Sequence, residues 1–275
     1  MNDAFVVTGP AEVDAEALRA VFAALSGLLP WTCVFYLPRR GAGIYMMRPQ
    51  EVHTPVDDLL DDLGETPLPP YIHEPLADPE RYQTVFSRYD GSVAVPTAGL
   101  HFTENQLKEL GSNGITQVAL TLHVGLGTFR PVKGNIADHE MHTEPLFISE
   151  QQLKILAENA GRPWVVVGTT TLRALESLYV LAEKIQSGFN MSTSTFTIQQ
   201  WDKWRTENTL SRSDAFRILH ETSAQKKSGL NGNTSLFITK GRPVKSADYL
   251  ITNFHQPKST LLMLVDAEEL SARFQ

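Results

Sequence analysis

Apolar side chains recur along this chain with two different periods, and each period predicts one kind of element. A period of three to four residues predicts a helix over 14–29, with an apolar face formed by Leu18, Val21, Phe22 and Leu25. A period of two predicts a strand that ends near residue 124, with apolar side chains at Val118, Leu120, Leu122 and Val124. His123 then lies on the opposite face of that strand. The chain is therefore expected to contain both helices and strands.

After residue 92 the expected elements alternate between strands and helices. Two capping boxes, Thr103-x-x-Gln106 and Ser149-x-x-Gln152, predict helices that end near Gly111 and Gly161. Further strands are expected at 164–167, 235–239 and 249–252, an amphipathic helix at 172–185, an irregular segment at 186–233, and a last helix from Ser259. This order predicts an α/β fold whose mixed or mostly parallel sheet is flanked by helices.

Composition divides the chain into three parts. Residues 1–65 are rich in alanine and acidic side chains, and we expect a small divergent N-terminal region there. Residues 66–91 are expected to form a connector, because prolines concentrated in 66–80 remove backbone donors and favour extended backbone. Residues 92–275 are expected to form an α/β core of catalytic type.

Composition and charge also exclude several classes of protein. No apolar run among the 275 residues approaches the roughly 20 residues of a membrane span, and no signal peptide is visible. The single cysteine, Cys33, fits a reducing compartment, so we expect a cytoplasmic protein. We also expect a monomer that does not contact a membrane. The net charge of −7 argues against a general nucleic-acid binder. Residues 226–258 nevertheless form a basic cluster, which suits either phosphate contacts or an ordinary solvated loop.

Three histidines stand at turns beside small residues and are the first candidates for a site. They are His101 in the segment Pro96–Thr103, His123 after a strand-like run, and His255 after another. None lies within an apolar stripe, and a neutral imidazole can take or give a proton near pH 7. A ligand-facing role is therefore favoured, with a satisfied structural histidine as the alternative for each.

Two glycine-containing turns are candidates for binding an anion. The turn Gly168–Thr171 stands between a predicted strand and a helix, where free N–H groups favour an anion unless threonine capping satisfies them. Gly125-Leu126-Gly127 either lets the backbone approach a ligand or simply turns sharply. Lys258 and Arg173 are candidate anion partners, although Arg173 and Glu176 equally suit a pair on a helix surface.

The segment Asp138–Glu144 raises the hypothesis of a metal site. His139, His142 and Glu144 are residue types that bind zinc. Their spacing matches no zinc signature, and the sole cysteine is remote, so we expect polar loop chemistry and no metal. The residues by themselves indicate a site with several histidines for a polar, anionic ligand.

Taken together, seven segments resemble one family, the S-adenosylmethionine:tRNA ribosyltransferase-isomerases of queuosine biosynthesis. The segments are Pro67–Ile72, Arg81–Phe86, Pro96–Thr103, Thr121–Pro131, Asp138–Glu144, Gly168–Glu176 and Leu250–Val265. They follow the family's order and cover about residues 65–265. Each is weak alone, whereas the set is highly specific.

The resemblance implies an enzyme that consumes S-adenosylmethionine as a co-substrate. Members transfer and isomerise its ribosyl part onto the aminomethyl group of a 7-deazaguanine base at the tRNA wobble position. Epoxyqueuosine forms in the tRNA, while adenine and methionine leave. On this basis we assign general acid–base catalysis, as a hypothesis, to His101, His123 and His255. S-adenosylmethionine binding is assigned to Thr97, Gly99, Gly125, Gly127, Thr169, Thr170, Arg173 and Lys258. The expected partners are S-adenosylmethionine and tRNA carrying 7-aminomethyl-7-deazaguanine.

The chain also departs from the family pattern. The family's N-terminal Asp-Thr-Arg segment and its inserted β-barrel are not found in 1–65, nor is a Phe-Ser-Tyr-Gly-Asp-type segment found after Val265. Residues 189–233 resemble an insertion that some members carry. These departures favour one alternative, a catalytically impaired paralogue that binds an adenosyl ligand or RNA. A third hypothesis rests on other residues: a metal-dependent hydrolase that uses His139, His142 and Glu144.

Overall fold

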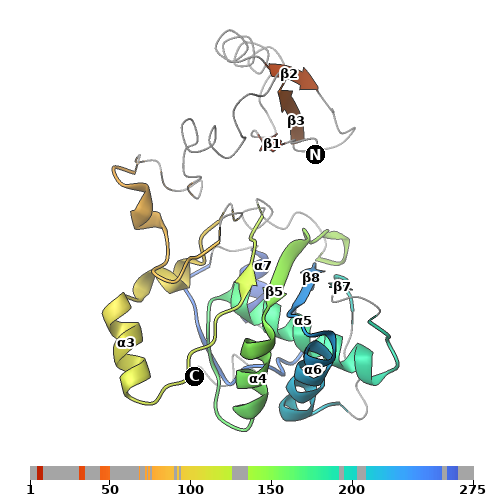
Figure 1. Ribbon diagram of the computed structural model, residues 1–275. Coiled ribbons are helices and arrows are strands. Elements are labelled where there is room, and N and C mark those ends of the chain that lie inside the picture. Colours follow the sequence, from red (N-terminus) through yellow and green to blue (C-terminus); the bar gives the residue numbers. More distant parts are fainter. Residues whose placement is uncertain are drawn as a thin grey trace. The chain divides into compact units, whose positions relative to one another are not determined.

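The chain divides into two compact units, Met1–Glu65 and Thr66–Gln275. The computed structural model describes strands at 5–8, 31–34 and 44–49, and then residues 68–125, 136–191, 195–202, 209–255 and 259–265, without 69–71, 73, 75, 90, 91 and 93. In the first unit β1 (Phe5–Thr8), β3 (Ile44–Pro49) and β2 (Trp31–Val34) form an antiparallel sheet in that order (Figure 1). The helix predicted over 14–29 lies outside the described residues. The connector at 66–91 stays a prediction.

A four-stranded mixed sheet forms one layer of the second unit. Its order is β4 (Thr121–Leu122), β5 (Glu144–Ile148), β8 (Leu230–Thr234) and β7 (Thr195–Ile198). β5 runs antiparallel to both β4 and β8, whereas β7 runs parallel to β8. Alternate residues of β5, β8 and β7 are buried, so one face of the sheet packs on the core. The expected α/β fold with a mixed sheet flanked by helices is confirmed.

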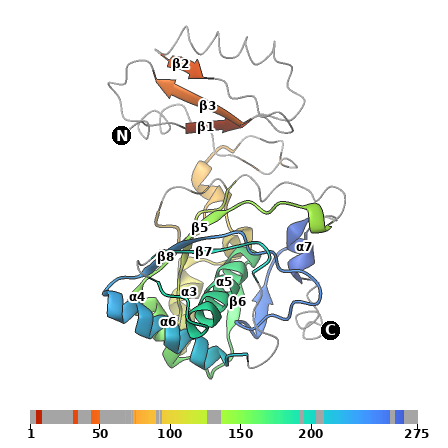
Figure 2. The ribbon, with the colours of Figure 1, turned by 90° about the vertical axis from the view of Figure 1, so that its right-hand side faces the viewer.

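Helix α5 (Thr169–Gln186) is the centre of that core. It contacts α6 (Arg212–Lys226), α7 (Thr260–Val265) and strands of both sheets of this unit, and α6 in turn packs on α4 (Glu150–Glu158). Figure 2 shows α4 and α6 on one side of α5 and α7 on the other. Every residue from Leu172 to Glu183 is buried. The prediction of an amphipathic helix was therefore wrong, because other elements cover α5 on all faces. No helix within the described segments is long and apolar enough to cross a membrane.

A parallel pair of strands leads directly into α5. β6 (Val165–Val167) pairs with β9 (Tyr249–Ile251), so both carboxyl ends lie at the same edge. Gly168 connects β6 to α5 with a φ of +91°, which glycine adopts without a steric penalty, and its N–H donates to the Ile251 carbonyl at 2.8 Å. The strand expected at 164–167 exists, but it is not fully buried, since Val165 is exposed.

Both predicted capping boxes are confirmed. Thr103 and Gln106 exchange hydrogen bonds at the start of α3 (Glu104–Ser112), and Ser149 and Gln152 do the same at the start of α4. These two helices depend on hydrogen bonds between residues three positions apart, and for that reason local sequence is enough to place them.

The segment 186–233 was expected to be irregular, and this prediction was wrong. It contains β7, α6 and β8, and β8 lies between β5 and β7 in the sheet. The strand expected at 235–239 is also misplaced, since β8 ends at Thr234. A β-carbon on Gly232 would lie 2.5 Å from the Phe196 carbonyl oxygen, so glycine allows β8 and β7 to approach closely. The strand forms there although glycine has a low strand propensity. Because β8 is a middle strand, this segment belongs to the core.

Candidate active site

His101 forms a hydrogen bond with the loop that follows β9. The short helix η2 (Thr97–His101) carries it, and its Nε2 lies 2.8 Å from Oδ1 of Asn253. An amide oxygen only accepts hydrogen bonds, so Nε2 carries the hydrogen, and Nδ1 is the ring nitrogen left to take up a proton. The side chain of His101 is exposed. His101 therefore combines the tautomer and the accessibility of a general base.

His255 belongs to the same loop. Its Nε2 lies 2.9 Å from Oγ1 of Thr252. Burial lowers the pKa of His255 below its ordinary value, because desolvation disfavours the charged ring. His255 is therefore neutral at pH 7 and able to accept a proton.

The N-terminus of α5 adjoins this loop through the bond between Gly168 and Ile251. Gly168 is the N-cap and provides no side-chain acceptor for the first-turn N–H groups. The hydroxyl of Thr171 donates backwards to the Val167 carbonyl at 2.7 Å instead of accepting from the first turn. The first turn thus presents donors and the positive end of an 18-residue helix. Thr169 is buried and Thr170 is half-buried at this terminus.

Glu144 connects three segments of the chain in a second network. It is 2% exposed and accepts from Arg173 Nη1 at 2.8 Å and from His142 Nε2 at 2.7 Å. The backbone N–H of Gly125 also donates to it. Burial alone would raise the pKa of Glu144, but these hydrogen bonds and the charge of Arg173 together hold it below its ordinary value. Glu144 is therefore ionised, and it fixes the exit of β4 against the first turns of α5.

The network decides between readings that the sequence left open. Arg173 is 6% exposed and pairs with Glu144, while the buried Glu176 accepts from the backbone and hydroxyl of Ser246. The idea of an Arg173–Glu176 pair on the helix surface was therefore wrong. A cation at Glu144 would face the guanidinium of Arg173, and no metal-binding group of three side chains occurs among the described residues.

The remaining predicted residues fall into different surroundings. The backbone N–H of His123 donates to Pro145 in β5, and its buried ring Nδ1 has no hydrogen-bond partner among the described residues. No hydrogen bond of His123 reaches His101 or His255 within the described residues. Thr97 is half-buried in η2. Gly127 and Lys258 lie outside the described residues.

Gly99 is buried against the segment that precedes η2. A β-carbon there would lie 2.6 Å from Cζ of Phe86 and 2.9 Å from Cγ2 of Thr84. The glycine therefore lets η2 pack closely, which is a structural role that the sequence did not separate from ligand binding.

Replacing Gly99 by Ala is expected to lower the free energy of unfolding by about 1–3 kcal/mol, the usual cost of overpacking a filled site. Gly161→Ala is the matched control, because nothing lies within 4 Å of a β-carbon there. Urea unfolding of both variants measures the difference. Equal midpoints for the two would contradict the packing role.

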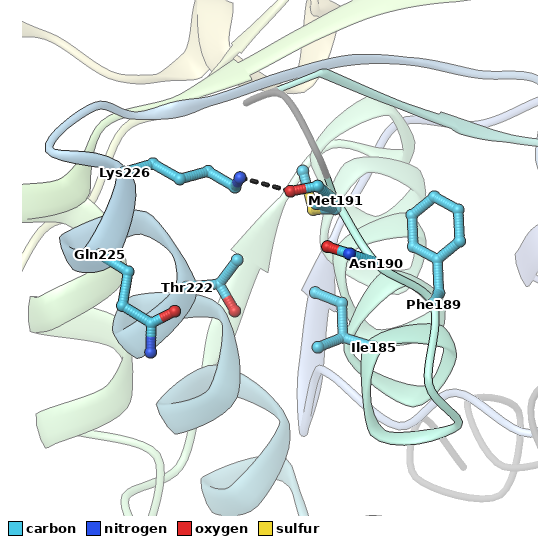
Figure 3. A pocket seen from close by; sticks show the side chains of 7 residues that line it. All are labelled: Ile185, Phe189, Asn190, Met191, Thr222, Gln225 and Lys226. Carbon is cyan, nitrogen blue, oxygen red and sulfur yellow. Dashed lines mark hydrogen bonds between the residues drawn. The ribbon is translucent and has the colours of Figure 1, made fainter.

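A pocket of about 310 Å³ lies at the other end of α5 (Figure 3). It is lined by Ile185, Phe189, Asn190, Met191, Thr222, Gln225 and Lys226. Eighteen helical residues span about 27 Å, so the pocket is remote from the helix N-terminus. Lys226 donates to the Met191 carbonyl, and Arg242 donates to the carbonyls of Phe237 and Asp202. Lys226 and Arg242 belong to the basic cluster, and both donate hydrogen bonds within the protein. This argues against a phosphate-binding role for these two residues.

The family model described as "Queuosine biosynthesis protein" matches residues 34–272. The chain belongs to this family. The resemblance expected over 65–265 is confirmed, and the match extends into the first unit, where it includes β3. No solved structure matches the chain.

As a member of this family, the chain has a role in queuosine biosynthesis, a tRNA modification. Two functional candidates had been missed: Asn253 as the partner of His101, and Glu144 as the carboxylate that Arg173 and His142 share. Glu144 had been considered only as a metal ligand. A signal in the sequence is Arg173 within the apolar positions of the helix after Gly168, since an arginine buried there needs a counter-ion.

Proposed function

We propose that this protein transfers and isomerises the ribosyl part of S-adenosylmethionine onto 7-aminomethyl-7-deazaguanine at the tRNA wobble position. The hydrogen bond between His101 and Asn253 carries the proposal. It joins two of the segments that resemble the ribosyltransferase-isomerases, 152 residues apart, at the carboxyl edge of β6 and β9. Ligands of α/β folds bind at such edges.

The chemistry needs a base for the proton beside the sulfonium and a proton donor for the departing adenine. His101 has a lone pair at an exposed ring, and His255 is held neutral by burial. Either one suits the base. The buried Nδ1 of His123 has no hydrogen-bond partner in the described part of the chain, and such a group is one that a bound ligand can satisfy.

The binding of S-adenosylmethionine is assigned to backbone-rich turns around these rings. The first turn of α5, with Thr169 and Thr170, suits the methionine carboxylate because its donors lack a side-chain cap. Arg173 is a positioning residue in this scheme, since its guanidinium is buried against Glu144. Thr97, Gly125, Gly127 and Lys258 complete the proposed set. A cytoplasmic monomer remains our expectation.

Incubation with S-adenosylmethionine and tRNA that carries the aminomethyl base should release adenine and methionine, measured by liquid chromatography. The same tRNA with an unmodified guanine is the control and should release neither. Binding of S-adenosylmethionine without release would favour a non-catalytic binding module. Activity that a chelator removes would favour the metal-dependent hydrolase.

A further inference from the structure

Phe254 is the most exposed large apolar side chain in the described part of the chain. Its relative exposure is 106%, whereas the other exposed large apolar side chains range from 38% to 66%. Isolated exposed apolar residues are common and need no explanation by themselves. The position of Phe254 is what distinguishes it.

Side-chain hydrogen bonds of the candidate site flank Phe254 on both sides. The preceding residue, Asn253, bonds to His101, and the following residue, His255, bonds to Thr252. Ile251, at the end of β9, accepts from Gly168 at the start of α5. An uncovered ring is thus carried by a loop with hydrogen bonds on each side of it.

We propose that Phe254 is a stacking platform for the purine-like ring of a substrate at the His101–His255 site. The inference rests on the proposed function, which supplies two such rings: adenine of S-adenosylmethionine and the 7-deazaguanine of the tRNA. An aromatic side chain can hold a nucleobase by stacking on its face, which works for any base and requires no hydrogen bond. The polar groups of the neighbouring residues then remain available for proton transfer.

Two substitutions separate stacking from simple apolar contact. Phe254→Leu keeps an apolar side chain but removes the aromatic face, and it should weaken base binding roughly 5- to 150-fold. Phe254→Trp keeps a face and should retain binding within about threefold of wild type, given its equal or greater stacking surface. Phe189→Leu is the matched control, because Phe189 is also exposed but lines the pocket at the far end of α5. The thermal midpoint should not change in Phe254→Leu, since the ring buries nothing.

The measurements are the Kd for S-adenosylmethionine by equilibrium dialysis and the KM for tRNA carrying the aminomethyl base. A weaker Kd in Phe254→Leu assigns the platform to adenine, and a higher KM with unchanged Kd assigns it to the deazaguanine. Both constants unchanged beside an active wild type would overturn the stacking role alone. A wild-type protein that neither binds S-adenosylmethionine nor modifies the tRNA would overturn the proposed function and this inference together.

Discussion

Replacing Glu144 by Gln is expected to lower the free energy of unfolding by about 3–5 kcal/mol, the largest stability loss that we predict for this protein. The side chains of Glu144 and Arg173 are only 3% and 7% exposed, so water cannot solvate the guanidinium when the carboxylate charge is removed. The amide of Gln keeps the volume and one acceptor oxygen, and the loss therefore comes from the unpaired charge. Urea unfolding measures it.

A surface pair provides the control for this prediction. Glu158 lies 3.9 Å from Lys154 on α4, with both side chains more than half exposed, so Glu158→Gln should cost less than about 1 kcal/mol. Combining Glu144→Gln with Arg173→Met should recover much of the loss, because the buried charge is then absent. A Glu144→Gln variant as stable as Glu158→Gln would contradict the proposed network.

The stability difference between wild type and Glu144→Gln should also depend on pH. The folded-state pKa of Glu144 lies below its ordinary value of 4.5, so its ionised form stabilises the fold above that pH. The contribution disappears as pH falls from about 4.5 through the lower folded-state pKa. The unfolding curves of the two proteins should therefore differ at pH 7 and converge in that acidic range. A stability difference that increases as the pH falls would contradict the predicted direction of this pH dependence.

Replacing His101 by Ala is expected to lower kcat roughly 10²- to 10⁴-fold, the range for loss of a general acid or base. The ring is exposed, and its bond to Asn253 joins two surface segments, so the thermal midpoint should change little. Asn253→Ala should lower kcat less, because the base remains but loses its fixed tautomer and orientation.

His220→Ala is the control for this series, since His220 lies on α6 and outside the candidate site. Steady-state release of adenine gives kcat and KM for each variant. If His101→Ala retains turnover within threefold of wild type, the base is a different residue, and His255→Ala becomes the decisive variant.

Local sequence predicted the parts of this fold that depend on neighbouring residues. The capping boxes before α3 and α4 were found because their hydrogen bonds join residues three apart. β8 was missed because Asn231, Gly232 and Asn233 have low strand propensity, and pairing with β5 and β7 on both sides overrides it. Helix α6 had a usable signal: Ser211 accepts from the N–H of Asp214, as in a Ser-x-x-Asp start.

The same distinction between local and long-range interactions applies to the candidate site. Motif segments predicted which stretches matter, including the turn that carries His101 and the loop that carries His255. The pairs His101–Asn253 and Glu144–Arg173 join residues that are distant in sequence, so no local pattern could supply them. Burial and the bond to Glu144 give Arg173 a partner that the sequence did not predict.

The most direct test of the central claim is the mass of the wobble nucleoside in tRNA after incubation with S-adenosylmethionine and this protein. Nucleosides from digested tRNA are separated by liquid chromatography and identified by mass spectrometry. The products of wild type and His101→Ala are compared on the same substrate. Our account predicts that wild type converts 7-aminomethyl-7-deazaguanosine to epoxyqueuosine and that His101→Ala leaves nearly all of it unconverted. An unchanged wobble nucleoside with wild-type protein that binds both substrates would contradict it.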